Sequence, residues 1–138
     1  MSDADELEEI RQEKIESLKK AEEGDAAGSS AAAPAEPVHV TGPDHLQEVA
    51  DEYDVVLVDF YADWCGPCKM IEPVVADLAR ETDAAVAKVD VDRLQQLAAQ
   101  YQVQGVPTLM LFSDGEVVER MTGARQKPQL EQLIRQYT

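Results

Sequence analysis

The sequence predicts an α/β fold with three layers, in which a central mixed β-sheet is flanked by helices on both faces. Apolar segments typical of strands alternate with segments whose apolar residues recur at helical spacing, in the order β-α-β-α-β-α-β-β-α. The final two strands are joined by Asp114-Gly115, a dipeptide typical of a tight hairpin turn. The only two cysteines lie where a strand turns into a helix, which places a candidate site at the C-terminal end of a strand.

The first half of the compact region is predicted to contain two strands and two helices. A short strand at 38–40 precedes a helix that Asp44 can cap and whose apolar residues share one face. The segment 55–60 is apolar on both faces of a strand, which indicates a central, buried position. The helix predicted over 70–80 has one apolar face and contains Pro73, which should kink it.

The second half adds three strands and two helices. Residues 84–91 form the next predicted strand, and Asp92 can cap the helix that follows. The hairpin pairs 108–112 with 116–120, and Gly123 ends its second strand. A last helix with one apolar face completes the chain.

The chain of 138 residues divides by composition into an acidic N-terminal extension, 1–37, and a compact domain, 38–138. The extension begins with a charged segment and continues as a linker rich in Gly, Ala, Ser, Glu and Pro. Four apolar residues of its charged segment fall within a narrow arc of a helical wheel: Leu7, Ile10, Ile15 and Leu18. Because four residues cannot form a core, we expect a solvated, partly helical tail, with a docking helix as the alternative.

The net charge of −16, from 28 acidic and 12 basic residues, bears on partners and habitat. It argues against nucleic acid and anionic membranes as partners. An excess of carboxylates with little lysine predicts a salt-loving microbe, because salt screens self-repulsion; an ordinary acidic protein is the alternative. The sequence has no apolar run of membrane-spanning length and no secretory signal, so we expect a cytoplasmic protein, and we expect it to be a monomer.

The two cysteines, Cys65 and Cys68, enclose Gly66-Pro67 at the predicted start of a helix. Free backbone N–H groups in the first helical turn favour an anion there, and the thiolate is the nucleophile of disulfide exchange. Pro67 fits the first helical position, where its missing N–H costs nothing. We therefore predict that Cys65 attacks a substrate disulfide and that Cys68, deeper in the helix, resolves the mixed disulfide.

Three other interpretations of the cysteine pair are weaker. A structural disulfide between cysteines this close would close almost no loop and stabilise little. A zinc site needs four ligands, and the only histidines are His39 and His45, which are most simply surface residues. Two inert core thiols would not require Gly-Pro between them. Since the sequence contains no flavin, nicotinamide or metal motif, we predict no cofactor and a separate protein as the electron donor.

Asp59 lies at the end of the central strand, on the same face as Val55 and Leu57. Burial there would raise the pKa of its carboxyl and suit it to moving a proton to or from Cys68. The alternative is an aspartate that faces water at a strand end. Lys88, in the next strand, either projects into solvent or lies near Asp59 and tunes its pKa.

The segment 58–69, VDFYADWCGPCK, resembles the thioredoxin family. The resemblance covers roughly 38–138 and extends through short matches at 87–90, 105–108, 114–115 and 122–124. It departs from the family at Tyr61, where many members carry tryptophan, and in the extension, which has no counterpart in a minimal thioredoxin.

The resemblance implies roles for residues in four parts of the chain. Cys65 would be the nucleophile and Cys68 the resolving thiol, with Asp59 as a buried carboxylate and Lys88 beside it. The Val106–Pro107 bond would be cis and would place Pro107 against the disulfide, while the Val106 backbone pairs with substrate. The flat docking surface for substrate would consist of Trp64, Gly66, Pro67, Val106, Pro107, Gly123 and Ala124.

The resemblance further implies a general protein-disulfide reductase that acts on disulfide-containing proteins and is kept reduced by a thioredoxin reductase. Within the same chemistry, a disulfide oxidase or isomerase is the alternative, since the residues between the cysteines tune thiolate stability. A second class of alternative is a binding subunit in which the thiols are incidental.

Overall fold

The structure is a computed structural model and describes residues 32–138. Its compact unit spans Ala33–Thr138. The helix predicted within the extension lies outside the described residues. The helices and strands follow the predicted order: β1 (Val38–His39), α2 (Pro43–Glu52), β2 (Val55–Tyr61), α3 (Gly66–Glu81), β3 (Ala85–Asp90), α4 (Gln95–Gln100), β4 (Thr108–Ser113), β5 (Glu116–Thr122) and α5 (Lys127–Tyr137).

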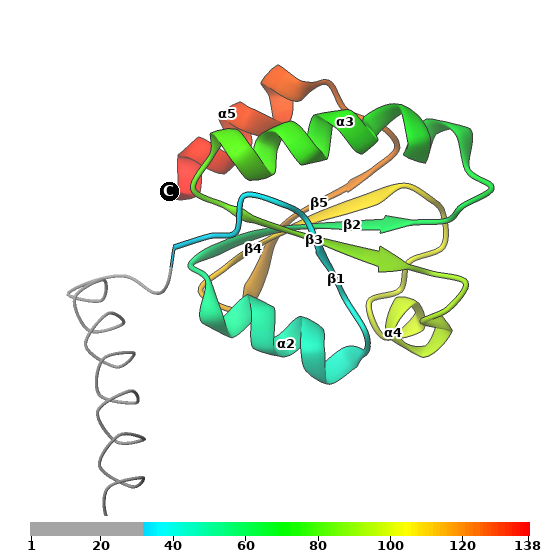
Figure 1. The fold of residues 1–138 in the computed structure, drawn as a ribbon. Helices are drawn as coiled ribbons and strands as arrows, with labels where there is room; N and C mark the ends of the chain where they lie inside the picture. Colours follow the sequence, from blue (N-terminus) through cyan, green and yellow to red (C-terminus); the bar gives the residue numbers. More distant parts are fainter. Residues whose placement is uncertain (1–31) are drawn as a thin grey trace, which may run out of the picture. The chain divides into compact units, whose positions relative to one another are not determined.

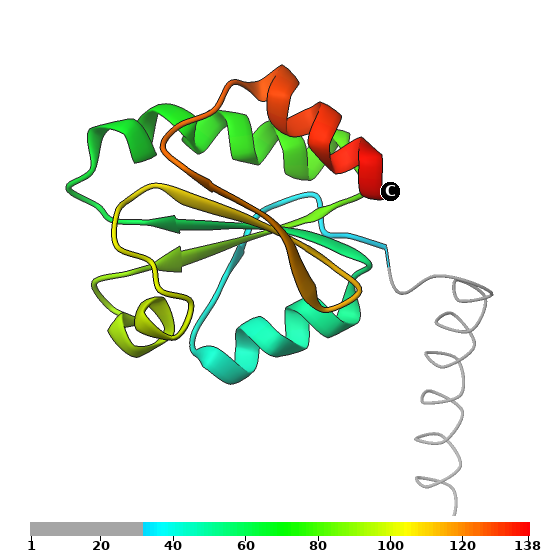
Figure 2. The ribbon, with the colours of Figure 1, turned by 180° about the vertical axis from the view of Figure 1, so that it is seen from behind.

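A five-stranded sheet with the order β1-β3-β2-β4-β5 forms the middle layer (Figure 1). The strands β1, β3 and β2 run parallel, whereas β4 is antiparallel to β2 and β5 is antiparallel to β4. Helices α3 and α5 cover one face, and α2 and α4 cover the other, as the view from behind also shows (Figure 2). The predicted three-layer fold with a mixed central sheet is confirmed.

Strand β2 lies at the centre of the sheet, and the part of it predicted to be buried on both faces is buried. Val56, Val58 and Phe60 belong to a core shared with α2. Val55 and Leu57 belong to the opposite core, which is shared with α3 and α5. Asp59 continues the alternation of Val55 and Leu57 and so faces α3.

Helix α3 begins at Gly66, one residue before Pro67, the predicted first helical position. Cys65 is its N-cap, so both Gly66 and Pro67 lie in the first turn, where the N–H that proline lacks has no intrahelical partner. Pro73 lies inside α3, which continues to Glu81.

The two predicted aspartate caps are wrong. Gly42 is the N-cap of α2, and Asp44 lies in the first turn, because Pro43 occupies the start of the helix, where its fixed φ is suitable. The N-cap of α4 is Leu94, and the Asp92 side chain bonds elsewhere. In both cases the aspartate remains near a helix start but does not cap it.

The hairpin between β4 and β5 has the predicted turn. Asp114 and Gly115 both have positive φ, 53° and 85°, which suits the two central positions of a tight hairpin. Thr122 ends β5, and Gly123 follows with φ 97°, so the predicted end of this strand is also confirmed.

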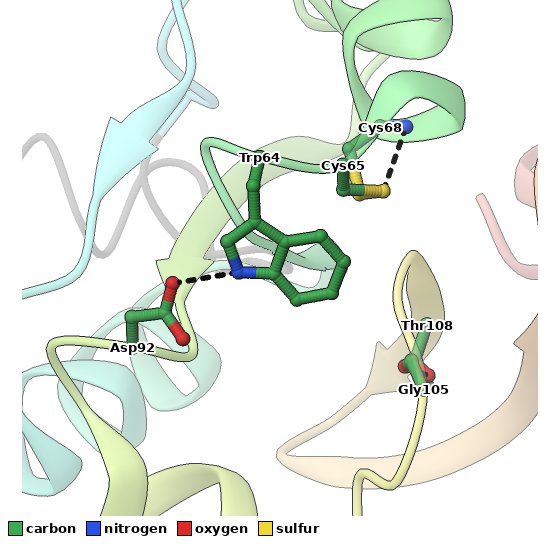
Figure 3. Close-up of a disulfide and its surroundings, with 6 residues drawn as sticks. All are labelled: Trp64, Cys65, Cys68, Asp92, Gly105 and Thr108. Carbon is green, nitrogen blue, oxygen red and sulfur yellow. Dashed lines mark hydrogen bonds between the residues drawn. A yellow bond between two sulfur atoms is a disulfide. The ribbon is translucent and has the colours of Figure 1, made fainter.

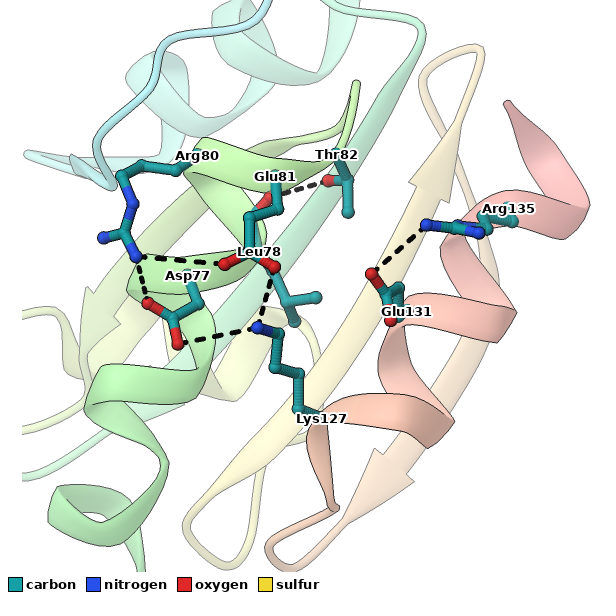
Figure 4. Close-up of polar contacts among 8 residues, drawn as sticks. All are labelled: Asp77, Leu78, Arg80, Glu81, Thr82, Lys127, Glu131 and Arg135. Atoms are coloured by element: carbon teal, nitrogen blue, oxygen red, sulfur yellow. Dashed lines mark hydrogen bonds and ion pairs between the residues drawn. The ribbon is translucent and has the colours of Figure 1, made fainter.

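Helix α5 packs beside α3 on one face of the sheet, and charged side chains join the two helices (Figure 4). Lys127 Nζ lies 2.7 Å from Glu81 Oε1 and 3.7 Å from Asp77 Oδ2. These groups are partly exposed, so salt screens their attraction. Burial of Leu130 and Ile134 against the same core is therefore the main contribution to the docking of α5.

Candidate active site

Cys65 and Cys68 form a disulfide at the start of α3, with their Cα atoms 5.3 Å apart. The Cys65 Sγ accepts a hydrogen bond from the Cys68 backbone N–H at 3.1 Å (Figure 3). This N–H belongs to the first turn of the helix, where backbone donors lack intrahelical partners. A donor aimed at a sulfur stabilises its anionic form, so this geometry favours a thiolate at Cys65.

Both cysteines are largely buried, at 4% and 2% exposure. With Ala62 they form a small apolar cluster against which Tyr61, Val91 and Val106 pack. The disulfide therefore lies at the edge of an apolar surface on which another protein would have to dock to reach it.

Trp64 is the most prominent feature of this surface, with 71% of its area exposed. Its indole Nε1 donates a hydrogen bond to Asp92 Oδ2 at 3.0 Å, which fixes the orientation of the ring (Figure 3). Beside the ring is a hollow of about 110 Å³ lined by Trp64, Val91, Val103, Gln104, Gly105 and Val106. An exposed aromatic ring next to an apolar hollow is typical of a surface that binds a peptide segment.

The loop before β4 forms the other wall of this hollow. Its Val106–Pro107 peptide bond is cis, as the resemblance implied. Thr108 Oγ1 donates to the Gly105 carbonyl at 2.6 Å and tightens the loop. The Gly123 N–H donates to the Pro107 carbonyl at 2.8 Å, which ties the end of β5 to this loop.

The residues predicted for the docking surface occupy three connected places. Trp64 and Val106 line the hollow, whereas Gly66 and Pro67 are exposed in the first turn of α3. Pro107 and Gly123 are joined by the hydrogen bond just described, and Ala124 is exposed next to Gly123. Neither Gly123 nor Ala124 lines the hollow.

Asp59 is fully buried on the face of the sheet that α3 covers. Among the described residues, neither of its carboxyl oxygens has a hydrogen-bond partner. Burial raises its pKa to about 6, the nearby Lys88 ammonium opposes this shift, and the Glu72 carboxylate adds to it. The structure therefore buries Asp59 on this face of the sheet and does not expose it at a strand end.

Lys88 does not project into solvent, since only 7% of its side chain is exposed. It is the register partner of Asp59 on the neighbouring parallel strand. Its Nζ lies 3.4 Å from Glu72 Oε1 and 4.4 Å from the centre of the Tyr61 ring, a distance that suits a cation–π contact. Of the two positions expected from the sequence, the strand register gives Lys88 the one next to Asp59. The Lys88 ammonium nevertheless pairs with the Glu72 carboxylate.

Several residues that contact this site are absent from the sequence-based predictions. Asp92 was assigned to a helix cap and instead holds Trp64. Val91 and Val103 line the hollow, and nothing in their local sequence distinguishes them from core residues. The sequence did contain a signal for Glu72, because this residue follows Cys68 by four positions and so lies on the same side of the helix.

The two histidines lie in β1 and α2, and His45 Nδ1 accepts the Thr41 N–H at 3.0 Å. Within residues 32–138, no three His, Cys, Asp or Glu side chains gather as metal ligands would. The same residues include no helix that is both long and apolar enough to cross a membrane.

Comparison with known proteins shows the family of this chain. The thioredoxin family model matches residues 36–136. The thioredoxin of Mycobacterium tuberculosis is 46% identical over 95 residues, which are 67% of this chain and 82% of that protein. The chain belongs to the thioredoxin family. The thioredoxin of Staphylococcus epidermidis is 44% identical over 99 residues, which are 70% of this chain and 93% of the relative.

Among solved structures, a mutant thioredoxin from Halobacterium salinarum is similar, with 57% sequence identity and a TM-score of 0.76. The similarity covers 79% of this chain and 96% of the Halobacterium chain. As a member of the thioredoxin family, the protein is a thiol-disulfide oxidoreductase that reduces protein disulfides by exchange through Cys65 and Cys68. The family also implies a reductase that returns the dithiol to its reduced form.

Proposed function

We propose that Cys65 is the attacking thiol of this protein and that Cys68 is the resolving thiol. The observation that carries this assignment is the hydrogen bond from the Cys68 N–H to the Cys65 Sγ. The Cys65 thiolate attacks one sulfur of a substrate disulfide, forms a mixed disulfide and releases the other substrate sulfur as a thiolate. Cys68 then attacks the Cys65 Sγ, so the Cys65–Cys68 disulfide forms and the second substrate thiol leaves. Two electrons pass from the dithiol to the substrate.

In the second step, Asp59 accepts the proton of the Cys68 thiol. A pKa of about 6 leaves this carboxyl mostly ionised near neutral pH, yet basic enough to accept a proton there. Its full burial on the face covered by α3, the helix that carries Cys68, supports this role. Lys88, from the adjacent strand, tunes the basicity of the carboxylate.

The substrate docks as an extended segment on the apolar surface around the disulfide. Trp64 and the hollow beside it bind an apolar side chain, while the Val106 backbone pairs with the substrate main chain. Gly66, Pro67, Pro107, Gly123 and Ala124 complete the docking surface. The cis peptide bond before Pro107 and the hydrogen bond from the Gly123 N–H to the Pro107 carbonyl support this arrangement.

The protein works as a monomer in the cytoplasm, where a thioredoxin reductase recycles it. A cysteine pair that functions by repeated reduction needs a compartment that supplies electrons, which supports this location. The charge of −16 supports the absence of nucleic acid and anionic membranes from its partners.

The assignment of the two thiols is tested by trapping with a Cys68→Ser variant. We expect this variant to remain covalently attached to substrate proteins through Cys65, because the resolving attack is lost. The adducts should be released by dithiothreitol and identified by mass spectrometry. The Cys65→Ser/Cys68→Ser double variant is the control and should capture nothing. Trapping by Cys65→Ser but not by Cys68→Ser would reverse the assignment.

The excess of carboxylates is expected to make the stability of this protein depend on salt, as in a salt-loving microbe. Repulsion among surface carboxylates is screened by potassium chloride. We expect the melting temperature to rise by about 5 °C or more between low and molar KCl, which for a domain of this size corresponds to about 1 kcal/mol. Differential scanning calorimetry of the full chain measures this effect. Equal melting temperatures in the two buffers would contradict a halophilic adaptation.

A further inference from the structure

Glu72 lies on α3 one turn after Cys68, outside the cysteine motif. Its side chain is 58% exposed, yet its Oε1 reaches inward to 3.4 Å from Lys88 Nζ. Both residues also line an open hollow of about 350 Å³, so the pair lies between solvent and the buried site.

The side chain of Lys88 is almost fully buried, and its ammonium interacts with two carboxylates. One is Asp59, its register partner on β2, and the other is Glu72 on α3. The ammonium pairs with Glu72 and lies over the Tyr61 ring, while both Asp59 oxygens are without hydrogen-bond partners among the described residues. A buried, unpaired carboxyl is costly as an anion, so the placement of this ammonium strongly affects its basicity.

The charged and titratable groups that interact with Asp59 come from three elements. Strand β3 contributes Lys88, α3 contributes Glu72, and β2 itself contributes Tyr61. On the other side, β4 pairs Asp59 with Leu109, which carries no charge. Lys88 is therefore the cation of this set, and Glu72 is the carboxylate that competes with Asp59 for it.

We propose that Glu72 is a positioning residue for disulfide exchange: its carboxylate draws the Lys88 ammonium toward α3 and away from Asp59, and thereby keeps Asp59 a base strong enough to take the Cys68 proton. This inference rests on the proposed role of Asp59. The proton moves from the Cys68 thiol to the Asp59 carboxylate as Cys68 bonds to the Cys65 Sγ and the substrate sulfur leaves as a thiolate. Without Glu72, the ammonium would turn to Asp59, stabilise its anion and make it a weaker base.

The test is a double-mutant cycle with Glu72→Gln, Lys88→Met and the combined variant in the full chain. The pKa of Asp59 is measured in the oxidised protein by ¹³C NMR of its labelled side-chain carboxyl. We expect Glu72→Gln to lower this pKa by about one unit when Lys88 is present. In the Lys88→Met background, the same change should lower it by less than about half as much, because no ammonium can relocate. Glu48→Gln, on the opposite face of the sheet, removes an equal charge and should leave the pKa unchanged.

The outcomes separate positioning from a simple charge effect. Equal shifts in the two backgrounds would mean that Glu72 acts only through its own charge, and no shift would mean that it does not act; either result overturns the proposal. In activity, the acidic limb of the pH–rate profile for disulfide reduction should move to lower pH in Glu72→Gln. If the acidic limb does not shift with the measured pKa of Asp59 across the variants, the proposed role of Asp59 is wrong. The NMR measurements still decide, independently of activity, whether Glu72 positions Lys88.

Discussion

Cys65→Ser is expected to abolish disulfide reduction, with a loss of at least about 10³-fold in the rate. The serine hydroxyl is not ionised near neutral pH and cannot exchange with a disulfide, although it fits the same N-cap position. The change therefore removes the nucleophile while it leaves the start of α3 intact. Reduction of insulin disulfides, followed by turbidity, measures the loss.

The same measurement separates an enzyme from a binding subunit. A role in binding would survive Cys65→Ser, whereas disulfide exchange would not. The rate of alkylation of the reduced wild-type protein tests separately whether Cys65 is a reactive thiolate. Because the Cys65 Sγ accepts an N–H at the helix start, position 65 should react at neutral pH faster than a free model thiol. Residual reduction by Cys65→Ser at more than about a tenth of the wild-type rate would refute the mechanism.

Asp59→Asn is expected to slow reduction and to stabilise the folded protein at the same time. Loss of a general base typically costs about 10²-fold or more in rate. Stability moves in the opposite direction, because the pKa of the buried carboxyl rises from 3.8 to about 6 on folding. A shift of this size corresponds to about 3 kcal/mol of destabilisation once the group is ionised.

The sign of the pH dependence follows from this raised pKa. Below about pH 4, the Asp59 carboxyl is protonated in both the folded and the unfolded state and has no cost. As the pH rises from about 4 through 6, the unfolded chain releases this proton first, so the free energy of unfolding falls. Above this window the loss is complete, and the advantage of Asp59→Asn over the wild type should be at its largest.

Urea unfolding of the oxidised protein at pH 4, 5, 6 and 8 measures this difference. Asp83→Asn is a suitable control, because Asp83 is exposed in the turn before β3. This substitution changes the net charge by the same amount as Asp59→Asn. A stability difference that is the same at all four pH values would show that Asp59 does not carry the raised pKa. An unchanged rate of reduction would remove Asp59 from the mechanism.

Local sequence pattern predicted much of the fold. The order of all nine elements in the compact region follows from apolar periodicity, and the hairpin follows from Asp114-Gly115, since both depend on neighbours in the sequence. The buried face of Asp59 could also be predicted, because strand alternation assigns it to the side of Val55 and Leu57. Helix caps could not, since Asp44 and Asp92 had competing positions and partners.

Sequence pattern alone is enough to place a lone cysteine pair at the start of a helix and to assign an aspartate to a buried face at the end of the central strand. Which charges meet around that aspartate depends on how distant elements pack together. The side chains of Lys88 and Glu72 are brought together by the packing of α3 on the sheet, across 16 residues of sequence. Local periodicity specifies the face of an element, whereas the partner across that face depends on the packing of elements distant in the chain.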